Sequence, residues 1–331
     1  MYVPQIRALC GVLCVVLIAT AAQAADKVKF STDGGPSGRH AYFFVAQEKG
    51  YYKNEGLEVE IIGGRGSASV IKEVAAGSID IGFADAGTLV LSRAKENVPV
   101  KLVAVVYRRA PHAMIGLKRP ELAKPTDLVG KKLADTAGSS NVVMFPAYAK
   151  AVGFDDKRVE WIFTDFNALP GLLVTGQVDA IGQYTLGLPL LRKRAAPKEL
   201  QVFAYRESGL DFYSNGIVVR DDYLASKRDI VVRFTRASLK ALQDALADPD
   251  EAAAMMSKHM PLIEKDIIAG EMKEVGLVAV DDISKTKGLG FVDEAKLLTT
   301  IDVMAANYEM PRKVTPAEIA DATVVPAALG R

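Results

Sequence analysis

The sequence predicts an α/β protein in which strands, glycine-rich loops and helices alternate along the chain. Three short apolar runs lie at residues 28–31, 57–62 and 79–83, and each ends in a loop rich in Gly, Ser or Asp. A helical pattern follows each loop, and this order predicts a parallel sheet with helices on its faces. Loops at the carboxyl ends of such strands form the binding crevice. We therefore expect one opening to be lined by residues 34–40, 63–69 and 85–88.

The first helix of this lobe is expected at about residues 38–49, with an apolar side around Phe43 and an end at Gly50. A second helix starts near Ser67, its expected N-cap, and turns an apolar face toward the sheet. The run at residues 100–107 is almost continuously apolar, as in a strand that is buried on both faces. A further short helix is expected at residues 89–94.

A second lobe repeats this order after a break at YRRAP, residues 107–111. A Gly-Ser-Ser-Asn loop at residues 138–141 precedes a helix at 142–152, so a helix N-terminus is again offered to a ligand. A second helix is expected at residues 168–175. The strands of this lobe are expected at residues 113–117, 132–134, 159–163, 178–181 and 200–205.

The return crossing to the first lobe is expected at residues 205–209, after which residues 216–219 rejoin the first sheet. Helices should then pack outside the first lobe, and the Ala/Pro-rich tail from residue 314 should be extended. These helices are expected at residues 221–246, 251–259, 263–275 and 293–307. The predicted division is a signal peptide at 1–24, a first lobe at 25–108 and 206–331, and a second lobe at 109–205. Two crossings form a short hinge, the geometry of closure around a ligand.

Residues 1–24 predict a cleavable secretory signal peptide, and we expect a periplasmic protein. Arg7 precedes an apolar run, and Ala22-Gln23-Ala24 forms a cleavage site. The run is shorter than the roughly 20 apolar residues of a spanning helix. A lipoprotein attached at Cys10 is the alternative, but Cys10 lies too early for a full apolar core before it.

The composition argues against several classes of site and partner. Both cysteines, Cys10 and Cys14, lie in the signal segment, so the cleaved chain has no disulfide, thiolate metal site or cysteine nucleophile. Cleavage takes Lys+Arg from 41 to 40 against 40 Asp+Glu, which leaves no basic excess for nucleic acid. The three histidines, His40, His112 and His259, show no metal-ligand spacing. We expect no metal and no cofactor.

A family resemblance is carried by GRHAYFFVAQEKGYYKNEGLEVEI (residues 38–61) and AAGSIDIGFAD (75–85), and it resumes in KPTDLVGKKLADTAGSSN (124–141). These stretches resemble the substrate-binding proteins of ABC importers, in the NMT1/THI5-like branch. That branch includes binding proteins for thiamine-precursor pyrimidines, riboflavin, sulfonates and nitrate. The resemblance implies a type II periplasmic-binding-protein fold, with two α/β lobes joined by a two-segment hinge. It weakens after about residue 206.

Candidate ligand-binding residues lie where strands end and helices begin, because free backbone N–H groups there attract anions and polar ligand atoms. Asp85 has a second possible role as the cap of the following helix. For His40, a structural role or a hydrogen bond to the ligand is expected in preference to metal binding. The predicted set is Arg39, His40, Tyr42, Ser67, Asp85, Gly138, Ser139, Ser140, Asp165, Phe166, Gln183 and Tyr184.

The chemistry of these positions leaves two ligand classes open. Flat rings stack on flat ligands, and about half of eight aromatic residues are expected to face the cleft: Tyr42, Phe43, Tyr107, Phe166, Tyr184, Tyr205, Phe212 and Tyr213. Asp85 and Asp165 suit amino or ring N–H groups, which favours a heteroaromatic ligand such as a pyrimidine or a flavin. Arg39, Ser139 and Ser140 suit a sulfonate or carboxylate instead.

The resemblance implies a non-catalytic binding protein that closes on a small-molecule ligand. Its implied partners are an ABC permease, through which it docks at the inner membrane surface, and the ATPase of that permease; we expect a monomer. An enzyme is the first alternative, since eukaryotic members make a thiamine pyrimidine from histidine and pyridoxal phosphate with iron. Those members carry a cysteine-rich motif, and this chain shows no Ser/His/Asp set, paired carboxylates or phosphate loop. A ligand-sensing module for a membrane receptor is the third class.

Overall fold

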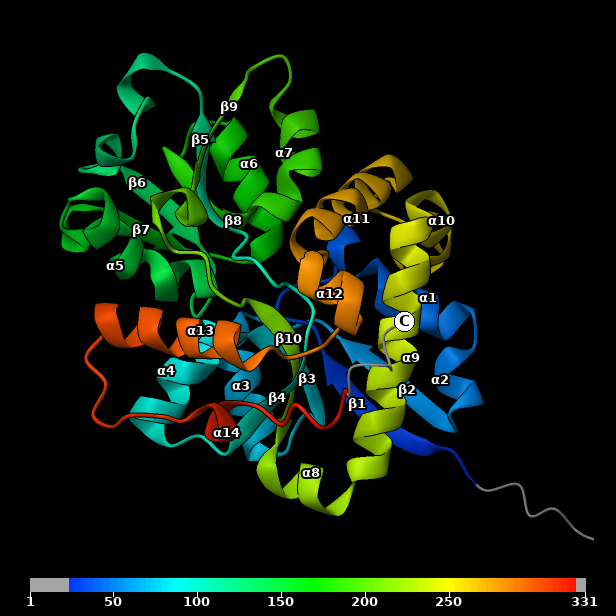
Figure 1. Ribbon diagram of the computed structural model, residues 1–331. Coiled ribbons are helices and arrows are strands. Elements are labelled where there is room, and N and C mark those ends of the chain that lie inside the picture. Colours follow the sequence, from blue (N-terminus) through cyan, green and yellow to red (C-terminus); the bar gives the residue numbers. More distant parts are fainter. Residues whose placement is uncertain (1–23, 326–331) are drawn as a thin grey trace, which may run out of the picture.

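The computed structural model describes residues 24–325, and apart from Ala24 the predicted signal peptide lies outside the described residues. Two five-stranded sheets form the centres of two lobes, and helices cover both faces of each sheet (Figure 1). The strand order is β2-β1-β3-β10-β4 in the first lobe and β7-β6-β8-β5-β9 in the second. In each sheet the first strand of the parallel set lies between the second and the third. Within residues 24–325, no helix has both the length and the apolar composition needed to cross a membrane.

The first sheet is mixed rather than parallel. β1 (Asp26–Ser31) runs parallel to β2 (Leu57–Ile62) and β3 (Ile81–Asp85). β10 (Asn215–Arg220) is antiparallel to β3 and to β4 (Val100–Val105). The prediction that residues 216–219 rejoin this sheet is confirmed, but the parallel arrangement is wrong for β10. The chain returns from the second lobe at the end of the sheet where β3 and β4 finish, so β10 must run in the opposite direction.

The second sheet has the same mixture of directions. β6 (Lys132–Asp135) is parallel to β7 (Glu160–Phe163) and β8 (Ala180–Tyr184). β5 (His112–Leu117) is antiparallel to β8 and to β9 (Leu200–Ala204). The predicted strands are all present.

Two predicted strands begin two residues later than their apolar runs. β3 starts at Ile81, because Asp80 accepts a hydrogen bond of 2.8 Å from the N–H of Lys29 and so is held beside β1. Asp179 accepts the corresponding bond of 2.8 Å from the N–H of Lys132, just before β8. Both strands also end later than predicted, so Asp85 and Tyr184 are the last residues of β3 and β8.

The lobes contain the helices that were predicted after the glycine-rich loops, together with two further helices. In the first lobe they are α1 (Ala41–Glu48), α2 (Tyr51–Asn54), α3 (Ser67–Ala76) and α4 (Ala86–Glu96). In the second they are α5 (Ser140–Val152), α6 (Leu169–Val174) and α7 (Leu188–Ala195). Short 3-10 turns occur at Gly38–His40, Pro120–Leu122, Pro125–Leu128, Asp156–Arg158, Phe166–Ala168, Thr185–Gly187 and Tyr205–Ser208. The sequence patterns did not predict α2 or α7.

The C-terminal region is more helical than expected and reaches both lobes. Its helices are α8 (Asp221–Ser226), α9 (Arg228–Ala247), α10 (Pro249–His259), α11 (Lys265–Ala279), α12 (Asp282–Lys287), α13 (Glu294–Asn307) and α14 (Pro316–Ile319). The extended tail predicted from residue 314 is wrong for α14, and Ala320 forms a bridge to Leu102 of β4. α13 lies beside α5 of the second lobe, and α11 lies near α7 (Figure 1).

The two crossings between the lobes run side by side. The N–H of Tyr107 donates to the carbonyl oxygen of Asn215 at 2.8 Å, and the N–H of Ser214 donates back to Tyr107 at 2.9 Å. Phe212 and Tyr205 lie in an apolar cluster that continues from the first lobe into the second. This pairing places the two connections in one narrow band at the back of the cleft.

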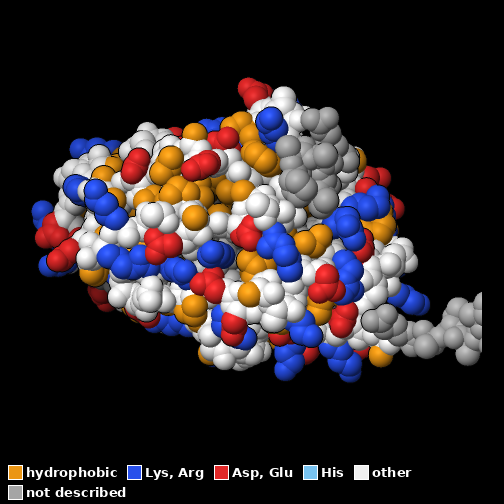
Figure 2. All heavy atoms as spheres, turned by 60° about the horizontal axis from the view of Figure 1, so that its bottom comes forward, with side chains coloured by type: hydrophobic (Ala, Val, Ile, Leu, Met, Phe, Trp, Pro, Cys, Tyr) orange, Lys and Arg blue, Asp and Glu red, His pale blue; other side chains and the backbone are white. Residues whose placement is uncertain are grey.

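The surface carries charges of both signs in close mixture. Figure 2 shows Lys and Arg side chains interspersed with Asp and Glu on the face it presents, around a smaller apolar area. The mixture agrees with a chain of 41 Lys+Arg and 40 Asp+Glu.

Candidate ligand-binding site

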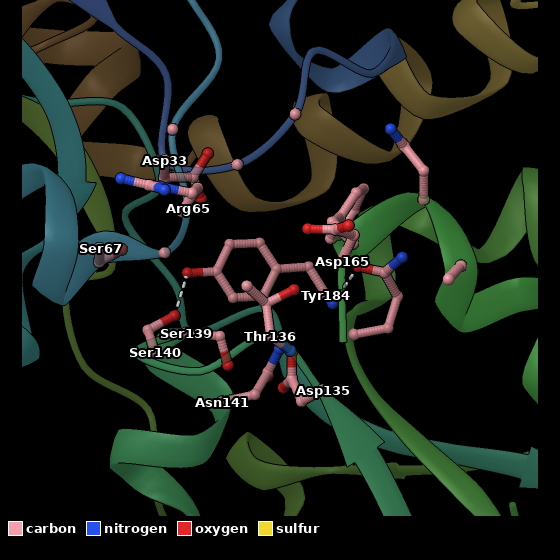
Figure 3. Close-up of a pocket in the computed structure, with 18 of the residues that line it drawn as sticks. Asp33, Arg65, Ser67, Asp135, Thr136, Ser139, Ser140, Asn141, Asp165 and Tyr184 are labelled. Atoms are coloured by element: carbon pink, nitrogen blue, oxygen red, sulfur yellow. Dashed lines mark hydrogen bonds between the residues drawn. The ribbon is translucent and has the colours of Figure 1, made fainter. Parts of the chain in front are cut away.

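A cavity of about 540 Å³ lies between the lobes. This volume falls in the range of about 300–1,000 Å³ that is typical of small-molecule sites. The first lobe contributes residues from the loops after β1 and β2 and from the turn and helix that follow them: Asp33, Gly34, Gly35, Arg39, Gly64, Arg65, Gly66 and Ser67. The second lobe contributes Asp135, Thr136, Ser139, Ser140, Asn141, Asp165, Phe166, Asn167, Ala168, Gln183 and Tyr184. Figure 3 shows the ring of Tyr184 in the middle of these side chains.

Asp33, just beyond β1, is the centre of a buried hydrogen-bond network. Its carboxylate accepts bonds from Arg39 Nη1 at 2.8 and 3.0 Å, from His40 Nε2 at 2.8 Å and from Asn215 Nδ2 at 2.8 Å. Burial alone would raise the pKa of Asp33, but the guanidinium of Arg39 and the bond from His40 hold it well below its usual range. Asp33 is therefore ionised and fully engaged by protein groups.

His40 is neutral and lies behind the cavity. Its Nδ1 accepts a hydrogen bond of 3.2 Å from the N–H of Ser37, so Nε2 carries the proton that is donated to Asp33. Burial and the neighbouring charge of Arg39 lower the pKa of His40 to about 4. The imidazole orients Asp33 and does not line the cavity.

Arg39 joins the two lobes through aromatic rings. Its guanidinium lies 5.2 Å from the ring centroid of Tyr184 and 5.8 Å from that of Phe166, both in the second lobe. These are cation–π distances. Tyr184 in turn donates a hydrogen bond of 2.7 Å to Asn215 Oδ1 in the first lobe, and it contacts the hydroxyl of Ser140.

The start of α3 touches the second lobe directly. The N–H of Ala68 donates to the carbonyl oxygen of Gly138 at 3.2 Å. Gly66 has φ +100°, and a Cβ there would lie 2.5 Å from that same oxygen, so only glycine allows the approach. The structure places Gly66 at the N-cap of α3, whereas Ser67 was expected there. Ser67 instead accepts a hydrogen bond of 3.1 Å from the N–H of Asp85.

The start of α5 brings a buried carboxyl group to the cavity. Ser139 caps this helix by accepting a hydrogen bond of 3.2 Å from the N–H of Val142. Asp135, at the end of β6, lies beneath this turn and is 2% exposed. Burial raises the pKa of Asp135 to about 7, against the opposing effect of Ser139, Asn141 and the N–H of Thr136.

Eight of the twelve predicted ligand-binding residues line the cavity: Arg39, Ser67, Ser139, Ser140, Asp165, Phe166, Gln183 and Tyr184. Gly138 stands next to them. Tyr42 is packed in the core of the first lobe against Phe43, and His40 lies behind Asp33. Asp85 takes its alternative role, since it caps α4 by accepting the N–H of Thr88 at 2.7 Å.

The expectation that about half of eight aromatic residues face the cleft is wrong. Only two of the eight, Phe166 and Tyr184, are among the described residues that line the cavity. The other six are buried in the apolar clusters of the lobes. Tyr42 and Phe43 lie on α1 and pack against Phe83 of β3. The other four lie in the segments that connect the lobes, where they are buried away from the cavity.

The sequence patterns missed several residues that line the cavity or support it. Asp33 lies two residues beyond β1 and Asp135 is the last residue of β6, so their position after an apolar run is the signal that sequence offers for them, and ordinary turn residues share it. Asn215 stands at the start of a strand, and its role depends on antiparallel pairing opposite Asp85. Among residues 24–325, no group of three or more His, Cys, Asp or Glu residues lies close enough to hold a metal ion.

Comparisons with known proteins agree with this architecture. The family model described as "NMT1/THI5 like" matches residues 37–252. The chain is 26% identical to the formylaminopyrimidine-binding protein of Halalkalibacterium halodurans, over 73% of this chain and 75% of that protein. It is 28% identical to the riboflavin-binding protein RibY of Chloroflexus aurantiacus, over 82% of this chain and 78% of that protein.

An enzyme and a solved structure are also similar to the chain. The 4-amino-5-hydroxymethyl-2-methylpyrimidine phosphate synthase of Aspergillus parasiticus is 24% identical, over 69% of each chain. The alkanesulfonate-binding protein SsuA from Xanthomonas axonopodis pv. citri superposes with a TM-score of 0.70 at 14% identity, over 89% of this chain and 98% of that one. The structural likeness confirms the predicted two-lobed α/β fold.

Proposed function

The chain belongs to the NMT1/THI5-like family, and we propose that it is the solute-binding component of an ABC-type importer. In this proposal the chain is exported to the periplasm, captures a small solute between its lobes and delivers it to an inner-membrane permease with its ATPase. The solute is heteroaromatic, of the thiamine-pyrimidine type. The observation that carries the proposal is the cavity of about 540 Å³ whose lining is divided between the two lobes.

The arrangement of the lobes supports capture by closure. The two crossings are paired at the back of the cleft, and the cavity lies in front of them. A short two-segment hinge of this kind lets two rigid lobes approach a ligand. Contacts such as Ala68 to Gly138 and Tyr184 to Asn215 form across the cleft and hold the closed arrangement.

We infer that the chain binds its solute without converting it, although several relatives are named as synthases. No histidine or cysteine is among the described residues that line the cavity. His40, just behind them, has both ring nitrogens engaged and a pKa lowered to about 4, so it is a poor general base or acid near neutral pH. Asp33 is ionised and satisfied by three side chains.

The test is solute binding by the purified chain from Ala25 onward. A panel of aminopyrimidines, thiamine, riboflavin, aliphatic sulfonates, nitrate and aromatic carboxylates is screened by thermal shift and then by calorimetry. A ligand that binds only the folded state adds about 2.7 kcal/mol of stability at a hundred times its dissociation constant. We expect one class to bind and small-angle scattering to show compaction with that ligand.

The permease is tested separately. Solute-loaded protein should stimulate the ATPase of a reconstituted importer, and the solute-free protein should not. Binding without any such stimulation would contradict the importer proposal and favour a sensing module for a membrane receptor. Absence of binding across the panel, together with unchanged scattering profiles, would contradict solute capture itself.

A further inference from the structure

A buried aspartate and a buried histidine face each other across the boundary between the lobes. Asp85 is the last residue of β3 in the first lobe, and His112 is the first residue of β5 in the second. Asp85 Oδ2 lies 3.4 Å from His112 Nε2, and both side chains are fully buried. Among the described residues, neither this oxygen nor either ring nitrogen of His112 has a hydrogen-bond partner. Buried polar atoms without partners are destabilising, so each group is the natural partner of the other.

The carboxylate of Asp85 is fixed in place by its own lobe. Its Oδ1 accepts hydrogen bonds from the N–H of Thr88 at 2.7 Å and from the hydroxyl of Thr88 at 2.8 Å. The N–H of Asp85 donates to Ser67 at 3.1 Å. Capping α4 therefore uses one oxygen only, and Oδ2 is left for a group of the second lobe. An N–H···O hydrogen bond spans about 2.7–3.2 Å, so a movement of a few tenths of an ångström would complete the contact.

The surroundings of His112 suit a positively charged ring. The centroids of Tyr184, Phe212 and Tyr205 lie 5.0, 5.3 and 6.0 Å from the centroid of its imidazole, and Tyr205 is stacked on it. Aromatic rings within about 6 Å attract a cation through their faces. A protonated imidazole carries an N–H on both nitrogens, so Nε2 can donate to Asp85. Such a charge-assisted hydrogen bond is roughly twice as strong as a neutral one.

The pair stands beside the hinge and behind the wall of the cavity. His112 directly follows the crossing at residues 107–111. In the two sheets Asp85 is paired with Asn215, and His112 is paired with Tyr184. Tyr184 lines the cavity and donates to Asn215 across the cleft at 2.7 Å. A rotation of the lobes that breaks this bond also moves Asp85 away from His112. Because a charge-assisted bond is confined to about 2.7–2.9 Å, a small rotation is enough to lose it.

Other titratable and charged groups surround the pair. Burial raises the pKa of Tyr184 and Tyr205 well above the usual range, so both rings are uncharged near neutral pH. Burial raises the pKa values of Asp135 and Glu271 to about 7, and these two groups change charge in the same interval as a histidine. The charged groups that act on the two tyrosines or lie on the crossings also include three ion pairs: Asp33 with Arg39, Arg108 with Asp281 and Arg109 with Asp211.

We infer that Asp85 and His112 form a proton-operated clasp between the lobes. Protonated His112 donates to Asp85 Oδ2 and holds the cleft closed, and loss of the proton to solvent releases the clasp. Histidine changes charge between about pH 5 and pH 8. The clasp is therefore formed at the acidic end of this interval and is lost as pH rises. The inference rests on the proposed function in one respect, since it takes closure of the lobes as the motion that retains a solute.

The test compares the solute-free chain from Ala25 onward at pH 5.5 and pH 8. The ratio of closed to open molecules is fitted from small-angle scattering profiles. We expect this ratio in the wild-type chain to be at least about tenfold higher at pH 5.5, because a hydrogen bond to a charged group is gained. H112Q keeps a neutral N–H donor but gains no proton, so it should lose this difference. The control is H259Q, which alters a histidine bonded to Glu48 at the surface and should behave as the wild-type chain does.

The substitution Asp85→Asn should invert the effect of pH. Both groups of Thr88 donate to Oδ1, so the new amide keeps its oxygen there and places its NH2 group where Oδ2 stood. Asparagine caps helices as well as aspartate does. The NH2 group donates to a neutral imidazole at pH 8, whereas at pH 5.5 it faces the N–H of the protonated ring. We expect D85N to be more compact at pH 8 than at pH 5.5. Asp135 and Glu271 are unchanged in every variant, so this inversion isolates the pair.

A closed-to-open ratio of the wild-type chain that is equal at pH 5.5 and pH 8 overturns the inference. A His112 ring that keeps one charge state over this interval, observed by NMR on the histidine-labelled wild-type chain, overturns it without any variant. D85N with the same direction of change as the wild-type chain overturns it as well, even if H112Q does not fold. None of these measurements uses a solute, so binding in the solute panel decides the proposed function separately.

Discussion

Tyr184 at the end of β8 in the second lobe donates a hydrogen bond of 2.7 Å to Asn215 at the start of β10 in the first lobe. The same side chain makes a second hydrogen bond, in which its Nδ2 donates to Asp33 at 2.8 Å. One side-chain amide thus connects the tyrosine of one lobe to the buried carboxylate of the other. The contact between the lobes and the hydrogen-bond network around Asp33 are therefore linked through these three residues.

Tyr184→Phe should weaken this connection while keeping the ring beside Arg39. The variant loses the hydrogen bond to Asn215 and the contact with Ser140. We expect the free energy of unfolding to fall by about 1–2 kcal/mol, because each buried hydrogen bond contributes about 1 kcal/mol. Urea denaturation measures the change, and Tyr223→Phe on α8, outside the cavity, is the control. Equal stability of Y184F and Y223F would contradict the coupling.

Asp33→Asn should leave the buried guanidinium of Arg39 without its counter-charge. Both side chains are about 95% buried and are joined at 2.8 Å. Breaking a buried ion pair from one side costs about 3–5 kcal/mol. We expect D33N to lose this much stability and the double variant D33N/R39M to recover part of it. A double variant that is less stable than the sum of the two single changes would argue against a direct pair.

Glu271→Gln should change how stability depends on pH. Burial raises the pKa of Glu271 to about 7, while its Oε2 accepts a hydrogen bond of 3.1 Å from the N–H of Arg39. The folded state therefore holds a proton that the unfolded state releases above about pH 4.5, so this group lowers stability as pH rises from 4.5 to 7. The variant lacks the ionisation.

We expect E271Q to gain stability relative to the wild-type chain across that interval and the difference to level off above pH 7. Chemical denaturation at pH 4.5, 5.5, 6.5 and 7.5 gives the comparison. The charge of Arg39 opposes the effect of burial, so the gain should be smaller than full desolvation would give. A difference that stays constant between pH 4.5 and 7 would show that Glu271 keeps its ordinary pKa.

Gly66→Ala should hold the lobes apart. The new Cβ would lie 2.5 Å from the carbonyl oxygen of Gly138, and the φ of +100° is itself unfavourable for alanine. Gly130→Ala is a matched control, because Gly130 has φ +75° and no atom within 4 Å of its added Cβ. We expect G130A to cost about 1 kcal/mol of stability and G66A to cost more.

Small-angle scattering completes this comparison. With saturating ligand, G66A should remain more open than the wild-type chain, whereas G130A should compact normally. Ligand affinity should fall only in G66A. Normal compaction of G66A would mean that the contact between Ala68 and Gly138 is not required for closure.

The sequence predicted the fold well because its periodic patterns are local. Each lobe alternates apolar runs with glycine-rich loops, and burial of both faces of a strand requires such runs. The direction of β10 was not predictable in this way, since it depends on where the chain returns from the second lobe. The late starts of β3 and β8 depend on Asp80 and Asp179, whose partners lie in neighbouring strands.

The residues of the candidate site that lie in loops after strands could be predicted from the sequence. The residues whose role depends on side chains distant in the chain could be predicted less well. Ser139, Ser140 and Phe166 follow directly from strand–loop–helix order. Asp33 and Asp135 resemble ordinary turn residues in sequence, and their burial is created by residues far away in the chain. Tertiary packing also decides which of two plausible roles Asp85 takes, since its N–H is held by Ser67 while its carboxylate caps α4.

Two helices of the first lobe, α11 and α13, contact the second lobe on opposite sides of the molecule (Figure 1). On one flank, Lys193 of α7 is paired with Glu264 and Asp266 at the start of α11, at 2.7 and 2.8 Å. On the other, Tyr308 just after α13 donates to the carbonyl oxygen of Val143 at 2.7 Å. Ion pairs at the surface weaken with salt, whereas hydrogen bonds to the backbone do so far less. Raised ionic strength should therefore weaken the contact between α7 and α11 before the contact beside α13. The lobes would then separate first on the α11 side and rotate about the contact at α13.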